Sequence, residues 1–96
     1  MGQGGGIGGQ AIGGDAASQR MLGIMYFDGL GIAKDRAAAA KWFRKGADVG
    51  DTASQRRLGE MLAYGQGIEK DEAAGAAQLG KAAAGGDAIA QLVAKG

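Results

Sequence analysis

The chain contains a unit of 36 residues that occurs twice in tandem. When residues 14–49 are aligned with residues 50–85, 19 of the 36 positions are identical. A period between about 20 and 50 residues is typical of solenoid proteins, in which each repeat is one supersecondary unit that stacks on the next. A third copy begins in phase at Gly86 and runs for half a unit, to Gly96. The sequence therefore predicts a stack of two full repeats and a half repeat.

Each repeat carries the signals of two helices. Asp15 and Asp35 stand where a carboxylate can accept hydrogen bonds from the free backbone N–H groups of a first helical turn. Gly29 follows the first stretch and allows the left-handed conformation that ends a helix. The same signals recur 36 residues later, so we predict an all-α solenoid of antiparallel helix pairs. The helices are expected at residues 16–27, 36–48, 52–63, 72–84 and 88–95.

Composition divides the chain into a tail and a repeat domain. Residues 1–13 contain seven glycines and little apolar surface, which predicts a flexible tail. The remainder forms the repeat domain and comprises repeat one (14–49), repeat two (50–85) and a C-terminal capping helix (86–96).

The C-terminal helix carries an apolar face. Leu92 and Val93 follow Ile89 by three and four residues, which places all three side chains on one face of a helix. We expect repeat two to cover this face, either in the same chain or in a partner after exchange. The helix would then cap the stack.

Periodic side chains predict which faces of the helices point inward in repeat one. They are Ser18, Leu22, Met25 and Tyr26 in the first helix, and Ala37, Ala40, Phe43 and Ala47 in the second, with Trp42 beside them. Small residues dominate the second set, which favours close pairing of the helices.

Glycine recurs inside the first helix of each repeat, at Gly23 and Gly59. Gly in a helix interior costs about 1 kcal/mol relative to Ala, so its recurrence suggests a steric reason. We expect the second helix of each repeat to approach closely at this point. The second helix of repeat two also contains Gly75 and Gly80, and we expect it to fray.

Composition argues against several classes of function. The chain has no Cys and no His, which removes thiolate chemistry, the commonest metal ligand and the usual general base near neutral pH. We therefore predict no enzyme activity and no metal site. A net charge of +1 argues against nucleic-acid binding. The absence of a long apolar run or a signal-like N-terminus argues against a membrane protein and makes the cytoplasm the default location.

Two glycine-rich segments match the sequence patterns of nucleotide-binding loops but lack the structural context that these loops require. Residues 4–9 fit G-x-G-x-x-G, but that turn needs a strand before it and a helix after it, and the tail offers neither. Residues 75–82 fit G-x-x-x-x-G-K and lie inside a predicted helix. They end with Ala82, which lacks the hydroxyl that holds Mg²⁺ in a P-loop. We therefore predict no nucleotide site and no cofactor.

A longer pattern connects the chain with a known family. The pattern is L-G-x-x-Y-x-x-G-x-G-I-x-x-D, with G-D-A before it and A-x-x-W after it. Repeat one carries it as Gly14, Asp15, Ala16, Leu22, Gly23, Tyr26, Gly29, Gly31, Ile32, Asp35, Ala39, Trp42 and Ala47. Repeat two keeps Gly50, Asp51, Leu58, Gly59, Gly65, Gly67, Ile68, Asp71 and Ala83, with Leu62 for Tyr and Gln78 for Trp. Residues 14–96 thus resemble the Sel-1-like repeat, a relative of the tetratricopeptide repeat.

The resemblance implies a right-handed superhelix that serves as a scaffold for proteins or peptides, without catalysis. It also implies that Tyr26 and Trp42 are packing residues, because family members have aromatic residues at both positions. In stacked helix pairs, the first helix of each repeat lines the concave wall. Helical spacing leaves these residues free of packing there and makes them the candidate binding residues: Arg20, Ile24, Phe27, Arg56, Glu60 and Ala63.

Alternatives remain for both the residues and the function. Arg20 and Arg56 could instead belong to a solvated surface, and Phe27 could instead cover a neighbouring helix. The chain as a whole is also compatible with a structural role, in which it associates with itself through the C-terminal helix. A designed or consensus repeat fragment without a ligand of its own is a further interpretation.

Overall fold

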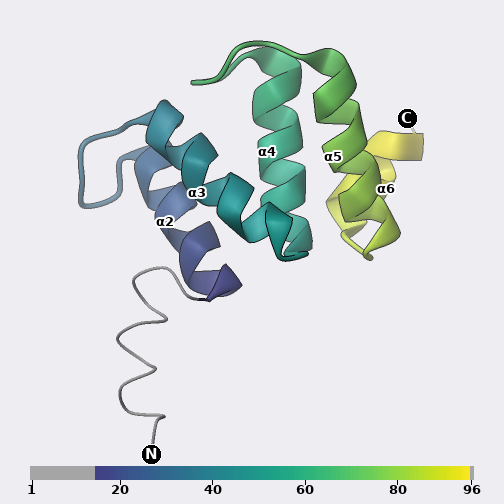
Figure 1. Ribbon diagram of the computed structural model, residues 1–96, viewed down its shortest axis with the longest axis horizontal. Helices are drawn as coiled ribbons and strands as arrows, with labels where there is room; N and C mark the ends of the chain where they lie inside the picture. The colour runs from purple at the N-terminus through teal and green to yellow at the C-terminus, as the bar shows by residue number, and fades with distance from the viewer. Residues whose placement is uncertain (1–14, 96) are drawn as a thin grey trace, which may run out of the picture.

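The computed structural model describes residues 15–95, which form five helices (Figure 1). They are α2 (Ala16–Asp28), α3 (Arg36–Asp48), α4 (Thr52–Tyr64), α5 (Glu72–Ala84) and α6 (Ala88–Lys95). All five predicted helices are present, and α2 and α4 each run one residue further than expected. No strand occurs between residues 15 and 95, so the all-α prediction is confirmed. The tail predicted for residues 1–13 lies outside the described part of the chain.

The helices pack in the order in which they follow one another along the chain. The hairpin α2–α3 lies beside the hairpin α4–α5 through the contact of α3 with α4, and α6 packs on α5 (Figure 1). Each of these helices from α2 to α5 contacts the next one along the chain, which is the arrangement of a solenoid. The first helices of the three units are therefore α2, α4 and α6.

An aspartate begins every helix, and each carboxylate accepts a hydrogen bond from the backbone N–H three residues further on. The N···O distances are 2.8–3.0 Å, for Asp15, Asp35, Asp51, Asp71 and Asp87. Gly29 and Gly65 end α2 and α4 in the left-handed conformation, with φ of 72° and 69°. These local interactions explain why the helix bounds could be predicted so closely.

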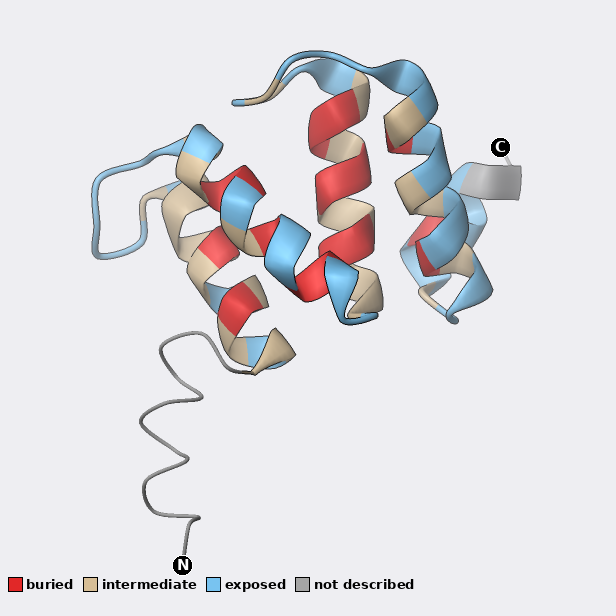
Figure 2. Ribbon diagram, in the orientation of Figure 1, coloured by how far each residue is buried: buried red, intermediate tan, exposed pale blue. Residues whose placement is uncertain are grey.

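The hydrophobic core lies mainly between α3 and α4, where Figure 2 shows most of the buried residues. Its buried members are Ala39, Ala40, Phe43, Ala47, Leu58, Met61 and Leu62. Tyr26 packs against this cluster, whereas Trp42 is half-buried and lies outside it. The prediction that Ala37 belongs to the inward stripe is wrong, because Ala37 is exposed and Ala39 is buried instead. Ala40, Phe43 and Ala47 are buried as predicted, and the burial of Ala39 widens the buried face because α3 is packed between α2 and α4.

The glycines inside α2 and α4 lie where their neighbours approach most closely. A Cβ atom on Gly23 would lie 2.6 Å from Cε1 of Phe43, and one on Gly59 would lie 2.9 Å from the carbonyl oxygen of Gly75. The predicted steric role is confirmed. Gly75 also packs, since a Cβ there would lie 2.7 Å from the carbonyl oxygen of Gly59. The expected fraying of α5 is not observed, because the helix is complete from Glu72 to Ala84.

The inward face predicted for the first helix of repeat one is only partly buried, whereas the corresponding face of repeat two is buried. Ser54, Leu58 and Met61 of α4 are buried against α3. Their counterparts Ser18, Leu22 and Met25 are only half-buried and line an open depression on the outer side of α2. Among residues 15–95, α3 is the only helix that packs closely on α2, so this face stays open.

The predicted covering of the apolar face of α6 is wrong within the chain. Ile89, Leu92 and Val93 are 51%, 70% and 50% exposed, whereas Ala90 is fully buried. The reason is the repeat register: Ala90 corresponds to Ser54, the residue through which α4 contacts the preceding helix. Apolar periodicity therefore does not mark the packing face of α6. A capping role for residues 86–96 stays a prediction.

Candidate functional site

Two of the predicted binding residues join one repeat to the next. Arg20 Nε donates to Asp51 Oδ2 at 3.0 Å, and Arg56 Nε donates to Asp87 Oδ1 at 3.1 Å. Both pairs are separated by 31 residues, and each aspartate is the N-cap of the following first helix. Arg56 also lies 3.6 Å from Glu60, measured from Nη1 to Oε2. The two arginines thus hold the start of the next repeat in place.

A glutamine that recurs after 36 residues supports the same two junctions. Nε2 of Gln55 donates to the carbonyl oxygen of Ala47 at 3.2 Å, and Nε2 of Gln91 donates to that of Ala83 at 3.1 Å. Each bond connects a first helix to the end of the preceding second helix. The recurrent glutamine is therefore a structural signature of stacking.

Asp51 is the carboxylate whose ionisation is most clearly affected by the fold. Burial raises its pKa, but the hydroxyl and backbone N–H of Ser54, together with the Arg20 guanidinium, hold the pKa of Asp51 below its ordinary value. The Ser54 hydroxyl donates to Asp51 Oδ2 at 2.6 Å. The folded protein therefore favours the ionised carboxylate more than the unfolded chain does.

We expect this shift to make the repeat junction sensitive to acid. Because the folded-state pKa of Asp51 is lowered, its stabilisation is complete above about pH 4 and is lost as the pH falls through the folded-state pKa. The melting temperature should therefore fall as the pH drops below about 4, and less so in Asp51→Asn. Asp35→Asn, which changes an exposed cap with no arginine partner among the described residues, is the matched control for the loss of a capping carboxylate. Equal slopes for both variants and wild type would contradict this role of Asp51.

A groove follows one side of α4 and brings together side chains from all three first helices. We call it the α4 groove, and its volume is about 310 Å³. Its lining residues are Phe27 of α2, Arg57, Glu60, Ala63 and Tyr64 of α4, Gln66 of the following loop, Leu79 of α5 and Val93 of α6. The groove thus exists only because three units are stacked.

The α4 groove combines aromatic, apolar and charged groups. Tyr64 is 72% exposed and Val93 is 50% exposed, so both present apolar surface to solvent. The Arg57 guanidinium carbon lies 5.8 Å from the ring centroids of Phe27 and Phe43. A cation within about 6 Å of an aromatic ring is attracted by the face of the ring. Such a surface can accept an apolar side chain beside a carboxylate.

The predicted binding residues separate into three environments. Phe27, Glu60 and Ala63 line the α4 groove. Ile24 packs against the core, and Arg20 and Arg56 bind the aspartates of the next repeat. In addition, the Arg36 guanidinium carbon lies 4.3 Å from the centroid of the Phe27 ring, so this ring also covers the start of α3.

Sequence reasoning missed several residues that line the groove, including Arg57 and Tyr64. The predicted stripe on α4 ran through residues 56, 60 and 63, whereas the groove follows residues 57, 60, 63 and 64. The groove thus shares residues 60 and 63 with the predicted stripe, but it has residues 57 and 64 in place of residue 56. The second arginine, directly after Arg56 and seven residues before an aromatic residue, was the signal that could have indicated this.

Residues 15–95 contain no cluster of three metal-ligating side chains. None of the described helices combines the length and apolar character needed to cross a bilayer.

The chain is similar to several solved structures. A Sel1 repeat protein from Oxalobacter formigenes is 36% identical over 85% of this chain and 24% of that protein, with a TM-score of 0.82. A protective antigen of uropathogenic Escherichia coli with an SLR fold is 36% identical over 84% of this chain and 17% of its own, with a TM-score of 0.80. Cysteine-rich protein B of Helicobacter pylori is 27% identical over 81% and 59%, with a TM-score of 0.78. The chain thus spans between 17% and 59% of these proteins.

A comparison with curated proteins found no match. A family model does match, and it describes the Sel1 repeat at residues 16–51 and again at residues 52–87. The two matches meet at the junction where Arg20 binds the cap of α4 and end where Arg56 binds the cap of α6. With two tandem matches over most of its length and the solenoid packing that they imply, the chain belongs to the Sel1 repeat family.

Proposed function

We propose that this chain is a protein-interaction module that binds a peptide segment of a partner in the α4 groove. Sel1 repeat proteins generally mediate interactions between proteins, and the family is typically non-enzymatic. The observation that carries the proposal is the exposed Tyr64 beside Arg57 in a groove built from three stacked units. A partner that contacts α2, α4 and α6 at once would therefore bind only when the three units are stacked.

The chemistry of the groove defines the kind of peptide that fits it. Tyr and Arg are the residues that most often dominate binding energy at protein interfaces, because they combine large contact area with directed polar groups. An apolar anchor of the peptide would lie between Tyr64, Leu79 and Val93. A neighbouring carboxylate of the peptide would pair with Arg57, which forms no ion pair among the described residues.

Selection of peptides from a displayed library on the immobilised chain tests the proposal. We expect Tyr64→Ala to weaken binding of the selected peptides by about tenfold or more, measured by fluorescence anisotropy, because the variant removes the central aromatic contact. Leu92→Ala is the matched control, since Leu92 is 70% exposed, as Tyr64 is at 72%, but does not line the groove. It should change the affinity by about twofold at most.

The same experiment separates this proposal from the second candidate, self-association through α6. Ile89, Leu92 and Val93 favour that candidate because they leave an exposed apolar face. Equal affinities of the Tyr64 and Leu92 variants would contradict peptide binding in the groove. A chain that selects no peptide, yet forms dimers that Leu92→Ala disrupts, would favour self-association.

A further inference from the structure

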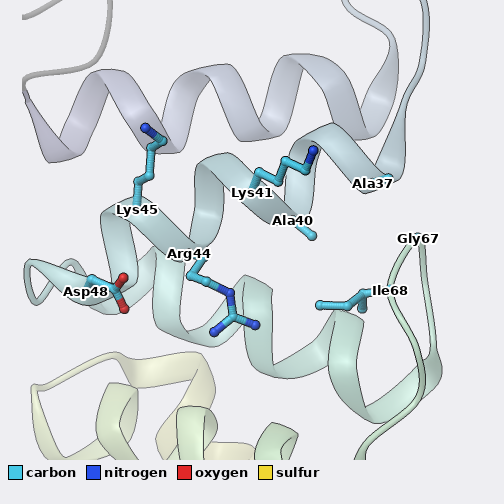
Figure 3. A pocket seen from close by; sticks show the side chains of 8 residues that line it. All are labelled: Ala37, Ala40, Lys41, Arg44, Lys45, Asp48, Gly67 and Ile68. Carbon is cyan, nitrogen blue, oxygen red and sulfur yellow. The ribbon is translucent and has the colours of Figure 1, made fainter.

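A second groove lies on the second helix of repeat one, away from the α4 groove. It runs between α3 and the loop that joins α4 to α5, and its volume is about 480 Å³ (Figure 3). We call it the α3 groove, and its lining residues are Ala37, Ala40, Lys41, Arg44, Lys45, Asp48, Gly67 and Ile68. None of them belongs to the α4 groove or to the ion pairs that join the repeats.

The base of the α3 groove is apolar and held in place by close packing. Ala40 is buried, and Ile68 packs against the hydrophobic core from the loop. A Cβ atom on Gly67 would lie 2.5 Å from the carbonyl carbon of Arg36, so the loop backbone rests directly on the start of α3. The wall opposite α3 is therefore fixed by backbone contact.

The rim of the α3 groove carries an excess of positive charge. Lys41, Arg44 and Lys45 project from α3, and Asp48 is the one acidic residue in the lining (Figure 3). Three cations against one carboxylate give this small surface a larger positive charge than the net +1 of the whole chain. No ion pair involves the three cations within residues 15–95.

Comparison of the two repeats shows that the packing of the helices does not require these cations. The residues of α5 that correspond to Lys41, Arg44 and Asp48 are Ala77, Gly80 and Ala84. Lys45 alone is retained, as Lys81. In spite of these replacements, α5 forms a complete helix. The charged rim is thus a feature of repeat one that stacking does not explain.

We infer that the α3 groove binds an acidic peptide segment with an aliphatic side chain, at a site separate from the α4 groove. The aliphatic side chain would lie against Ala40 and Ile68, and flanking carboxylates would pair with Lys41, Arg44 and Lys45. Charge-assisted hydrogen bonds of this kind are about twice as strong as neutral ones. A nucleic acid would use the cations but not the apolar base, so the combination favours a peptide.

Nuclear magnetic resonance titration of the full chain tests this inference. The probe is an acetylated pentapeptide with Leu between two pairs of acidic residues. We expect it to shift backbone amide signals of residues 37–48 and 67–68, and to lose affinity as the salt concentration rises. No shift at millimolar peptide, or shifts confined to the α4 groove, would overturn the inference.

Matched variants make the titration specific to the groove. Lys45→Glu should weaken binding of the acidic pentapeptide by about tenfold, whereas Lys81→Glu, the same change at the same position of repeat two, should leave it unchanged. Lys41→Gln is a second exposed variant that removes charge without reversing it, and it should weaken binding less than Lys45→Glu. Equal effects of Lys45→Glu and Lys81→Glu would overturn the inference. A single-stranded oligonucleotide that shifts the same amides more strongly than the peptide would overturn it as well.

Discussion

Replacing Phe43 with Ala should abolish most of the cooperative unfolding transition of this chain. Phe43 is fully buried at the centre of the α3–α4 core, and its ring fills the space that Gly23 leaves open in α2. Truncation of a buried Phe costs about 3–5 kcal/mol, which approaches the whole stability of a domain of this size. Urea denaturation followed by circular dichroism should show a loss of the folded baseline at 25 °C.

Trp42→Ala is the informative control for Phe43→Ala. Trp42 is the larger aromatic residue and lies next to Phe43 in sequence, yet it is half-buried and outside the core cluster. The Nζ atom of Lys45 lies 5.4 Å from the centroid of the Trp42 ring, so part of the ring faces a charged side chain. We expect a cost of about half that of Phe43→Ala or less. A larger cost for Trp42→Ala would contradict the position of the core.

Adding one methyl group to Gly59 should destabilise the chain, although Ala favours helices more than Gly does. A Cβ at this position would lie 2.9 Å from both the carbonyl oxygen of Gly75 and Cγ of Leu79. Relief of this contact requires α4 and α5 to separate, and overpacking of this kind costs about 1–3 kcal/mol. We expect the melting temperature of Gly59→Ala to fall by several degrees, about 4–8 °C for each net 1 kcal/mol.

Gly80→Ala provides the opposite outcome with the same chemical change. Gly80 lies inside α5 and is exposed, and a Cβ atom added to it would meet no atom within 4 Å beyond its own helix and neighbours. The variant should gain about 0.5–1 kcal/mol from helix propensity. If Gly59→Ala were as stabilising as Gly80→Ala, the close contact between α4 and α5 would not exist in solution.

The helices and their bounds could be predicted from the sequence because their signals are local. The carboxylate of Asp35 reaches a backbone N–H only three residues away, and Gly29 ends α2 through its own φ angle. The recurrence of these signals after 36 residues then fixed the repeat. Close packing at Gly23 could be predicted as well. Glycine lowers helix stability, so its recurrence at the equivalent position of repeat two indicates a steric requirement.

Side-chain environments could be predicted less well because they depend on contacts between repeats. Arg20 and Asp51 are 31 residues apart, and only the stacking geometry brings them within 3.0 Å. The same geometry turns Arg57 toward the α4 groove and leaves Leu92 exposed. Helical spacing places residues on a common face, but the neighbouring helix decides whether that face is buried.

The most direct measurement is an isotope-filtered nuclear Overhauser spectrum of the chain bound to a selected peptide. Contacts between the peptide and the Tyr64 ring, together with the Val93 methyl groups, are the predicted result, since both side chains are exposed in the α4 groove. Contacts confined to Met21 and Met25 on the outer side of α2, with none to Tyr64, would contradict the proposed site of interaction.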